Sequence, residues 1–292
     1  MPELQYSILS TIKYFDVFHY PLASREVFTT LPTNSVTEKD VQSMLESMVR
    51  SGVIQESGQF YFLPGRSPAL IHERNDREAL AKIMQRRARW VTHVFKRFPF
   101  VRAVFLTGSL SKNVAYDNSD IDLLIVTAPY RVWICRTLFT IFKKLLLLNY
   151  NKYCCFNFIV SEDALAIEQR NIYTAIETAT VMPLWNLAIF RRFNEANRWI
   201  FDFLPNWISN EDHQLLISSR RSWFQWLVEK CLSVLPLARL DERLLKIWKI
   251  IWAKRHPELT AEERELRFQC SRDISTRWDI NYYETIRKKI TD

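Results

Sequence analysis

The stretch VFLTGSLSKNVAYDNSDIDLLIV, residues 104–126, constrains the fold more than any other part of the sequence. It joins two apolar runs of strand length, VRAVFLT and DIDLLIVT, through a short polar spacer. Gly108 lies at the end of the first run and is the only glycine after Gly65. Since glycine has no Cβ, it allows the backbone to come close to a ligand. The pattern predicts a strand, a helix or turn that begins at Gly108, and a second strand.

The residues around Gly108 have the chemistry of an anion site. Backbone N–H groups at the start of a helix attract phosphate, and Ser109 adds a hydroxyl donor. Lys112 adds a positive charge three residues later. We therefore predict that Gly108, Ser109 and Lys112 bind the phosphates of a nucleotide.

Two acidic residues open the second apolar run. Asp120 and Asp122 occupy alternate positions, so on a strand both carboxylates project from one face, roughly 6–7 Å apart along the chain. Carboxylates in this arrangement can hold two Mg²⁺ ions about 4 Å apart, which is the spacing that clamps both oxygens of an in-line phosphoryl displacement. Asp120 and Asp122 are the predicted metal ligands and catalytic residues, with Mg²⁺ or Mn²⁺ as the cofactor.

At these residues the sequence resembles the nucleotidyltransferase superfamily of DNA polymerase beta. The similarity consists of the apolar strand, Gly108-Ser109, a spacer of ten residues, and Asp120-Ile121-Asp122. It covers roughly residues 75–165. The resemblance implies an α+β domain with a mixed sheet, and transfer of a nucleoside monophosphate from an NTP to an acceptor that the sequence does not name.

The resemblance also implies a third carboxylate on a following strand, and here the chain departs from the pattern. In CCFNFIV, residues 154–160, the position expected to face the site is Asn157, which carries no negative charge. The alternative third ligands are Glu162 and Asp163, just past this strand, and Glu177, on the next expected helix. The departure leaves a second hypothesis open, a catalytically silent module that binds nucleotide or a protein partner.

The first 64 residues form a separate pattern. Apolar periodicity predicts helices around residues 4–18, from Ser24, and after a Thr37-x-x-Asp40 cap, followed by the short strands VIQE and QFYFL. This order resembles a winged-helix domain. The segment has four Lys or Arg against seven Asp or Glu, so DNA binding is unlikely and docking on the same chain or on a protein partner is preferred.

The rest of the chain divides at a linker and near residue 170. PGRSP, residues 64–68, reads as the linker, and a long helix is predicted from Asn75 to about Phe98 with Leu80, Ile83, Met84, Ala88, Val91 and Phe95 on its apolar stripe. We predict a winged-helix-like domain over 1–64, a nucleotidyltransferase domain over 70–170, and a helical domain over 171–292 that covers the cleft.

Composition limits the environment and the partners. Beyond residue 64 the chain has 36 Lys or Arg against 25 Asp or Glu, so an anionic partner is expected to meet this part. Eight of the ten tryptophans lie after residue 170 beside basic residues, and they serve either as core anchors or as an RNA-binding face, the third functional hypothesis. The cysteines are odd in number and lack metal-ligand spacing, and the sequence shows no signal-peptide pattern. Since no segment reaches about 20 apolar residues either, we expect a cytoplasmic protein without a transmembrane segment.

Overall fold

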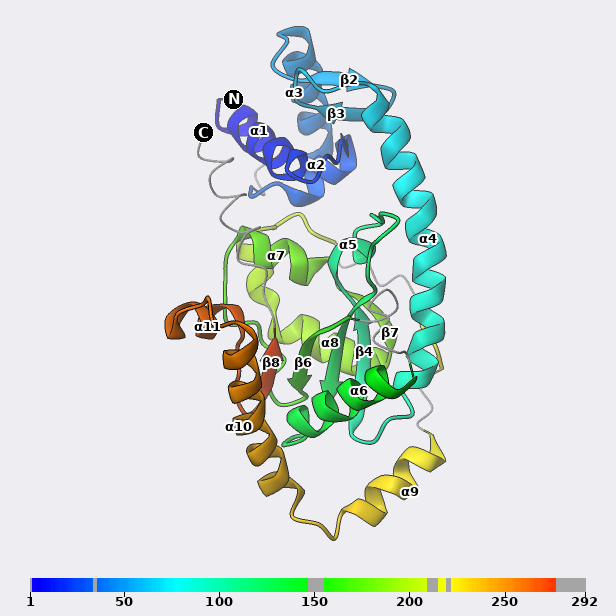
Figure 1. Ribbon diagram of the computed structural model, residues 1–292. Helices are drawn as coiled ribbons and strands as arrows, with labels where there is room; N and C mark the ends of the chain where they lie inside the picture. The colour runs from blue at the N-terminus through cyan, green and yellow to red at the C-terminus, as the bar shows by residue number, and fades with distance from the viewer. Residues whose placement is uncertain (1, 34–35, 147–154, 209–214, 219–221, 277–292) are drawn as a thin grey trace.

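The computed structural model describes residues 2–33, 36–146, 155–208, 215–218 and 222–276. In Figure 1 a small N-terminal unit lies at one end of the molecule, a five-stranded sheet lies at its centre, and α9 (Trp223–Leu232) lies at the opposite end. The long helix α4 (Ala69–Phe95) connects the first two parts.

The N-terminal unit has the predicted helices and hairpin, and one strand that was not predicted. Its small antiparallel sheet has the order β1-β3-β2. β1 has only two residues, which is too short to give a periodic signal. The elements are α1 (Pro2–Asp16), β1 (Leu22–Ala23), α2 (Ser24–Thr30), α3 (Glu38–Arg50), β2 (Gln55–Ser57) and β3 (Phe60–Phe62).

The start of α3 shows how the local sequence builds this unit. The Thr37 hydroxyl accepts a hydrogen bond from the Asp40 N–H, and the Asp40 carboxylate accepts one from the Thr37 N–H, which is the reciprocal capping box read from the sequence. The apolar stripe of α3 then buries Val41, Leu45 and Met48 in the core of the unit.

Helix α4 begins six residues before the predicted start, and its buried stripe is partly different. Met84, Ala88 and Phe95 are buried as expected, but Ile83 is largely exposed. Polar residues of α4 occupy buried positions instead. Arg74 is buried because it bonds to Glu26 of the N-terminal unit, and Gln85 because it bonds to the carbonyl of Leu110 in the central part. A rule that counts only apolar residues therefore misplaces the stripe.

The central sheet is mixed, as predicted for the α+β fold, and has the order β7-β4-β5-β6-β8. β5 runs antiparallel to β4 and parallel to β6. The outer strands pair antiparallel to their neighbours. The strands are β4 (Val101–Leu106), β5 (Asp122–Thr127), β6 (Cys155–Ser161), β7 (Met182–Trp185) and β8 (Ile274–Thr276).

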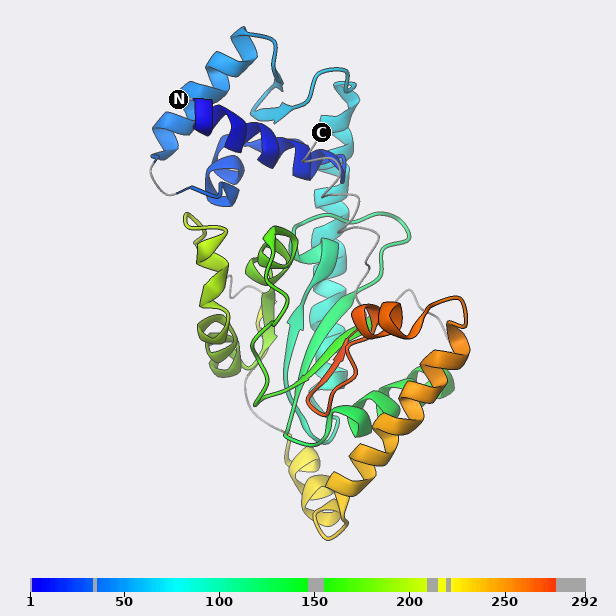
Figure 2. The ribbon, with the colours of Figure 1, turned by 90° about the vertical axis from the view of Figure 1, so that its left-hand side faces the viewer.

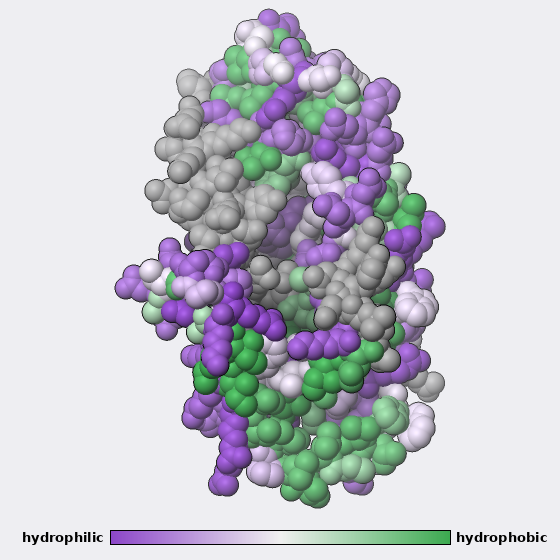
Figure 3. All heavy atoms as spheres, in the orientation of Figure 1, coloured by the Kyte–Doolittle hydropathy of each residue, from purple (hydrophilic) through white to green (hydrophobic). Residues whose placement is uncertain are grey.

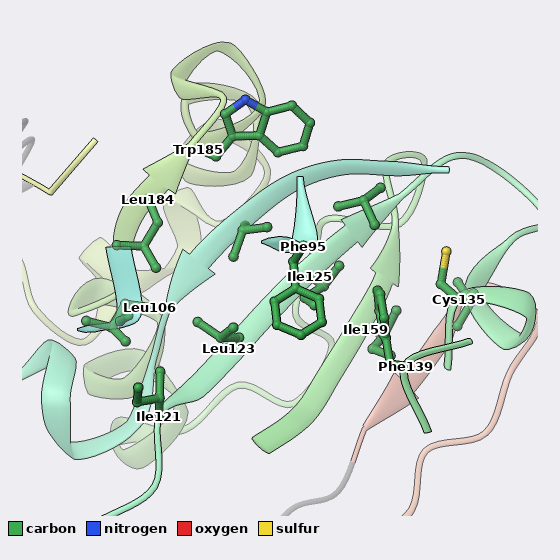
Figure 4. Packing of buried hydrophobic residues seen from close by; sticks show 14 of the residues in the cluster. Phe95, Leu106, Ile121, Leu123, Ile125, Cys135, Phe139, Ile159, Leu184 and Trp185 are labelled. Atoms are coloured by element: carbon green, nitrogen blue, oxygen red, sulfur yellow. The ribbon is translucent and has the colours of Figure 1, made fainter. Parts of the chain in front are cut away.

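Helices cover both faces of this sheet (Figure 2). Alternate residues of β5 point to opposite faces, so Leu123 and Ile125 pack with α4 and α6 (Val132–Leu146), as Figure 4 shows. Leu124 and Val126 pack on the other face with α7 (Ile172–Ala179) and α8 (Leu187–Ala196).

The expectation that the chain is helical from residue 171 to its end is wrong at two places. β7 and β8 come from this part and form the two edges of the central sheet. Both are short, with four and three residues, so neither shows the alternation that marks a strand. Residues 171–276 therefore complete the central sheet rather than forming a purely helical domain.

Helix α10 (Leu237–Arg255) packs along α6, and α11 (Ala261–Arg267) follows it. Trp248 and Trp252 of α10 are buried in the core beside Trp133. These two tryptophans act as core anchors. Within the predicted helical domain over 171–292, α7 and α8 contribute residues to the cleft at the start of β5, whereas α10 and α11 contribute none.

The N-terminal unit docks on its own chain. Tyr14 of α1 is buried in the core formed by α7 and α8, and Val114 of the central part is buried in the core of the N-terminal unit. The Arg66 guanidinium makes a bidentate ion pair with Asp16 at 2.6 and 2.8 Å. Each part thus contributes an apolar side chain to the other part's core.

In the part of the chain that the structure covers, no helix combines the length and the apolar character needed to cross a membrane.

Candidate functional site

The loop that contains Gly108 and the start of β5 are held together by the pairing of β4 with β5. Leu106 pairs with Leu123 in the antiparallel register. The N–H of Thr107 then donates a hydrogen bond to the carbonyl of Asp122 at 3.0 Å. The short helix α5 (Gly108–Ser111) begins at the next residue. Gly108 and Asp122 therefore become neighbours although 14 positions separate them in the sequence.

Gly108 is a glycine because Asp122 occupies the space of its missing side chain. Its φ is +71°, in the left-handed region that favours glycine. A Cβ at this position would overlap Oδ2 of Asp122 and would lie 3.1 Å from both the Cβ and the Cγ of Asp122. The close approach seen in the structure is to the carboxylate of Asp122, whereas the sequence led us to predict a close approach to a bound phosphate, which stays a prediction.

The predicted site residues line one pocket of about 510 Å³ between the N-terminal unit and the central sheet. Loop residues form one side, and residues of α7 form another. Of the sequence-predicted residues the pocket brings together Gly108, Ser109, Lys112, Asp120, Asp122 and Glu177.

Asp120 and Asp122 share the pocket, but only Asp122 lies in the strand. β5 begins at Asp122, and Asp120 is part of the segment that leads into it. Ile121 between them is fully buried, whereas both aspartates are partly exposed. The buried isoleucine anchors the segment, and the alternation turns the two flanking carboxylates toward the pocket.

Lys112 has protein partners at the pocket wall. Its Nζ donates a hydrogen bond to the Gly108 carbonyl at 3.0 Å and lies 2.8 Å from Oε1 of Glu177. Both side chains of this ion pair are about one-fifth exposed. The pair ties the Gly108 loop to α7 and places a cation beside the loop.

Comparison with known families agrees with this geometry. Residues 89–172 match the family model described as nucleotidyltransferase domain. The matched segment contains β4, α5, β5, α6 and β6 and ends where α7 begins. The match supports membership of this segment in the nucleotidyltransferase superfamily. No curated protein and no solved structure matches the chain.

Asn157 lies in β6 of the segment that matches the family model, and its side chain is outside the described part of the structure. The pairing of β6 with β5 is irregular here: Asp122 pairs with Cys155, but Leu124 pairs with Phe158. One extra residue on β6 interrupts the alternation from which the orientation of Asn157 was predicted. Phe158 lines the pocket beside Leu124.

Glu162 does not lie at the site. Its N–H donates a hydrogen bond to the carbonyl of Thr127, the last residue of β5, at 2.9 Å. Asp122 is the first residue of the same strand, roughly 16 Å away at the usual rise per residue. The Glu162 carboxylate pairs there with Arg192 at 3.6 Å and with Arg102 at 4.0 Å. The suggestion that Glu162 is the third ligand is wrong because β5 and β6 are parallel and Glu162 follows the far end of β6.

The donor set of the pocket suits a hard divalent cation, because two carboxylates face it from one short segment. Among the residues that the structure describes, no three Asp, Glu, His or Cys side chains gather into a metal-binding group. Asp120 and Asp122 could supply two protein ligands to such a cation, and the third carboxylate of the pocket, Glu177, pairs with Lys112.

Sequence reasoning missed the walls of the pocket that come from outside the nucleotidyltransferase segment. Phe15, Phe18 and Tyr20 of the N-terminal unit line it, as do Tyr173 and Thr178 of α7. No motif marks these residues, since they reach the pocket only when the N-terminal unit and α7 pack against the sheet. Burial and the nearby carboxylate of Glu177 hold the pKa of Tyr14, in the adjoining core, well above its ordinary value.

Proposed function

We propose that the chain is a metal-dependent nucleotidyltransferase that moves a nucleoside monophosphate from an NTP to an acceptor and releases pyrophosphate. The observation that carries the proposal is the packing of Gly108 against Asp122, inside the segment that matches the nucleotidyltransferase model. This packing puts a phosphate-type loop and two carboxylates on one pocket.

The roles follow from the chemistry of each group. Asp120 and Asp122 would hold Mg²⁺ or Mn²⁺. When bound, the metal supplies charge for the phosphate oxygens and orients the displacement. Gly108 and Ser109 would hold the β and γ phosphates, Ser109 through its hydroxyl. Lys112, held by Glu177, adds positive charge at the loop.

The aromatic residues of the N-terminal unit give the pocket a wall suited to a flat or apolar group of a substrate. Phe15, Phe18 and Tyr20 line the pocket, and so does Tyr116 of the loop, whose hydroxyl donates a hydrogen bond to the carbonyl of Phe18. Aromatic faces stack on nucleobases without selecting one base. The wall is therefore compatible with any NTP, and the acceptor is to be identified by screening.

The test removes the metal ligands together. The double substitution Asp120→Ala and Asp122→Ala should abolish Mg²⁺-dependent binding of labelled NTP and pyrophosphate release, because both metal ligands are lost. Asp117→Ala is the matched control, since Asp117 is an exposed aspartate of the same loop that does not line the pocket. Unchanged NTP binding by the double variant would contradict the proposal.

A second function is favoured by the pairing of Glu177 with Lys112, which engages the third carboxylate of the pocket. With two carboxylates left for the metal, the chain could act as a catalytically silent module that binds nucleotide. A screen with each NTP, Mg²⁺ or Mn²⁺ and candidate acceptors separates the two functions. Nucleotide binding without pyrophosphate release under every condition identifies the silent module.

A further inference from the structure

Apolar side chains cover the end of the molecule that lies farthest from the N-terminal unit (Figures 1 and 3). They come from α9, the turn after it and the first residues of α10, which we call the α9–α10 tip (residues 223–240). Val234 is 84% exposed and Trp223 is 74% exposed. The large exposed apolar side chains of the tip are Trp223, Phe224, Trp226, Leu227, Val234, Leu235 and Leu240.

Contacts on the inner side hold the tip in this orientation. The buried side chain of Gln225 donates hydrogen bonds to the carbonyls of Phe98 and Val101, both at 2.8 Å. The Glu229 carboxylate accepts hydrogen bonds from the N–H of Phe100 at 2.6 Å and from the guanidinium of Arg102 at 3.0 Å. The polar face of α9 therefore points inward and the apolar face points to solvent, the reverse of an ordinary surface helix.

The acidic and basic residues of α9 and α10 also differ in their surroundings: the acidic ones are paired or buried, and basic ones are exposed. Of their acidic residues, Glu229 is engaged with Arg102, and Asp241 is buried against the start of α6. The third, Glu242, pairs with Lys246 at 3.3 Å. Basic residues point outward, with Lys230, Arg239 and Arg243 exposed on or next to the tip. The apolar surface is thus bordered by positive charge.

We propose that the α9–α10 tip docks on a membrane surface that contains anionic phospholipid. Aromatic and aliphatic side chains with a border of Lys and Arg are the composition of interfacial membrane-binding helices. Tryptophan and aromatic rings lie favourably at the headgroup level, and each basic residue near an anionic surface adds attraction. Val234 and Leu235 have no ring that could stack on a base and no donor for a phosphate, which favours lipid over RNA as the partner.

Vesicle co-sedimentation of the full chain tests the proposal. The protein should sediment with phosphatidylcholine vesicles that contain about a third phosphatidylserine, and much less with phosphatidylcholine alone. Val234→Asp with Leu235→Asp should lower binding by about tenfold or more, because two apolar anchors become charged. Lys230→Glu with Arg239→Glu should do the same by reversing the attraction.

Matched controls separate the tip from general effects of charge. Tyr6→Asp with Ile83→Asp places the same charges on exposed apolar positions elsewhere, and Lys39→Glu with Arg50→Glu makes the same charge reversal on α3. Both control variants should bind like the unmodified chain. Equal losses in the tip and control variants would overturn the proposal.

Two further outcomes would also overturn it. One is binding of single-stranded RNA at low salt, weakened by the tip substitutions, without binding to anionic vesicles. The other is a dimer in sedimentation velocity that the Val234→Asp, Leu235→Asp variant converts to a monomer, since the tip would then be covered by a second copy of the chain.

Discussion

Gly108 shows how one residue couples its loop to the first residue of β5. Its left-handed backbone and the contact with Asp122 both exclude a side chain. Gly58 has a similar φ of +64°, but no atom lies near the place where its Cβ would be. Substitutions at the two glycines therefore separate the free-energy cost of the backbone conformation from the cost of steric overlap.

We predict that Gly108→Ala lowers the free energy of unfolding by about 3 kcal/mol, from backbone strain and overlap with Asp122 together. Gly58→Ala should cost about 1 kcal/mol, because only the strain applies. Urea denaturation of both variants measures the difference. Equal losses would show that the Asp122 carboxylate moves aside freely and that Gly108 does not position it.

At the scale of elements, α6 depends on a carboxylate from α10. Oδ1 of Asp241 accepts hydrogen bonds from the N–H groups of Trp133 and Ile134 at 2.9 and 2.8 Å, which satisfies donors in the first turn of α6. Burial raises the pKa of Asp241 to about 6, although these two hydrogen bonds and Arg131 oppose the increase. The cap is therefore made by a group that titrates at mildly acidic pH.

The raised pKa gives a pH dependence of stability with a definite sign. Since the pKa of Asp241 is higher in the folded chain than in the unfolded one, its protonation stabilises the fold at low pH, and this contribution is lost as the pH rises from about 4 to about 6. We predict that the unfolding free energy of the unmodified chain minus that of Asp241→Asn falls over this interval. Urea titrations at both ends of the interval measure it, and a rise would contradict the prediction.

Helix α4 is attached to the N-terminal unit by a buried arginine. The Arg74 guanidinium pairs with Glu26 and Glu78, each at 2.8 Å, and stacks over the rings of Tyr20 and Phe60. It also bonds to the carbonyl of Pro21. One side chain thus joins α4, α2 and the small sheet.

We predict that Arg74→Ala lowers the free energy of unfolding by about 3 kcal/mol, because it leaves the buried Pro21 carbonyl and two partly exposed carboxylates without their partner and removes a buried side chain stacked on two rings. Arg198→Ala is the control, since it breaks an exposed pair with Glu195 and should cost less than about 1 kcal/mol. Thermal and urea unfolding compare the two variants. A similar small cost for both would mean that water replaces the Arg74 contacts.

At the scale of the whole molecule, the docked N-terminal unit supplies one wall of the pocket. Tyr14 and Tyr6 lie on the same helix, α1, with exposed fractions of 3% and 65%. Tyr14 packs into the core of the central part, beside the helices that line the pocket. Its burial therefore contributes both to stability and to the shape of the site.

We predict that Tyr14→Ala lowers the free energy of unfolding by about 3–5 kcal/mol, the usual cost of removing a buried aromatic ring. Tyr6→Ala should change it by less than about 0.5 kcal/mol. The first variant should also weaken NTP binding, because the wall formed by Phe15 and Phe18 loses its support. If Tyr14→Ala destabilised the chain without any effect on NTP binding, the N-terminal wall would have no part in the site.

The local sequence was sufficient to predict the elements that depend on neighbours along the chain. The strand, loop and strand over residues 101–127 were predicted because apolar runs of strand length and a rare glycine are local signals. The capping box at Thr37 was readable for the same reason, since it is completed within one helical turn, and the box at Thr260 is built in the same way. The resemblance to nucleotidyltransferases rests on this same segment, and the family match covers it.

Tertiary structure alone decided the positions that depend on distant parts of the chain. β7 and β8 are strands because the sheet edges offer unpaired backbone groups, not because their few residues prefer that conformation. Glu162 and Glu177 were equivalent candidates in the sequence, but the direction of β6 removes the first and the packing of α7 brings the second to Lys112. The sequence by itself therefore determined the loop and the two aspartates, whereas long-range packing determined which other side chains meet them.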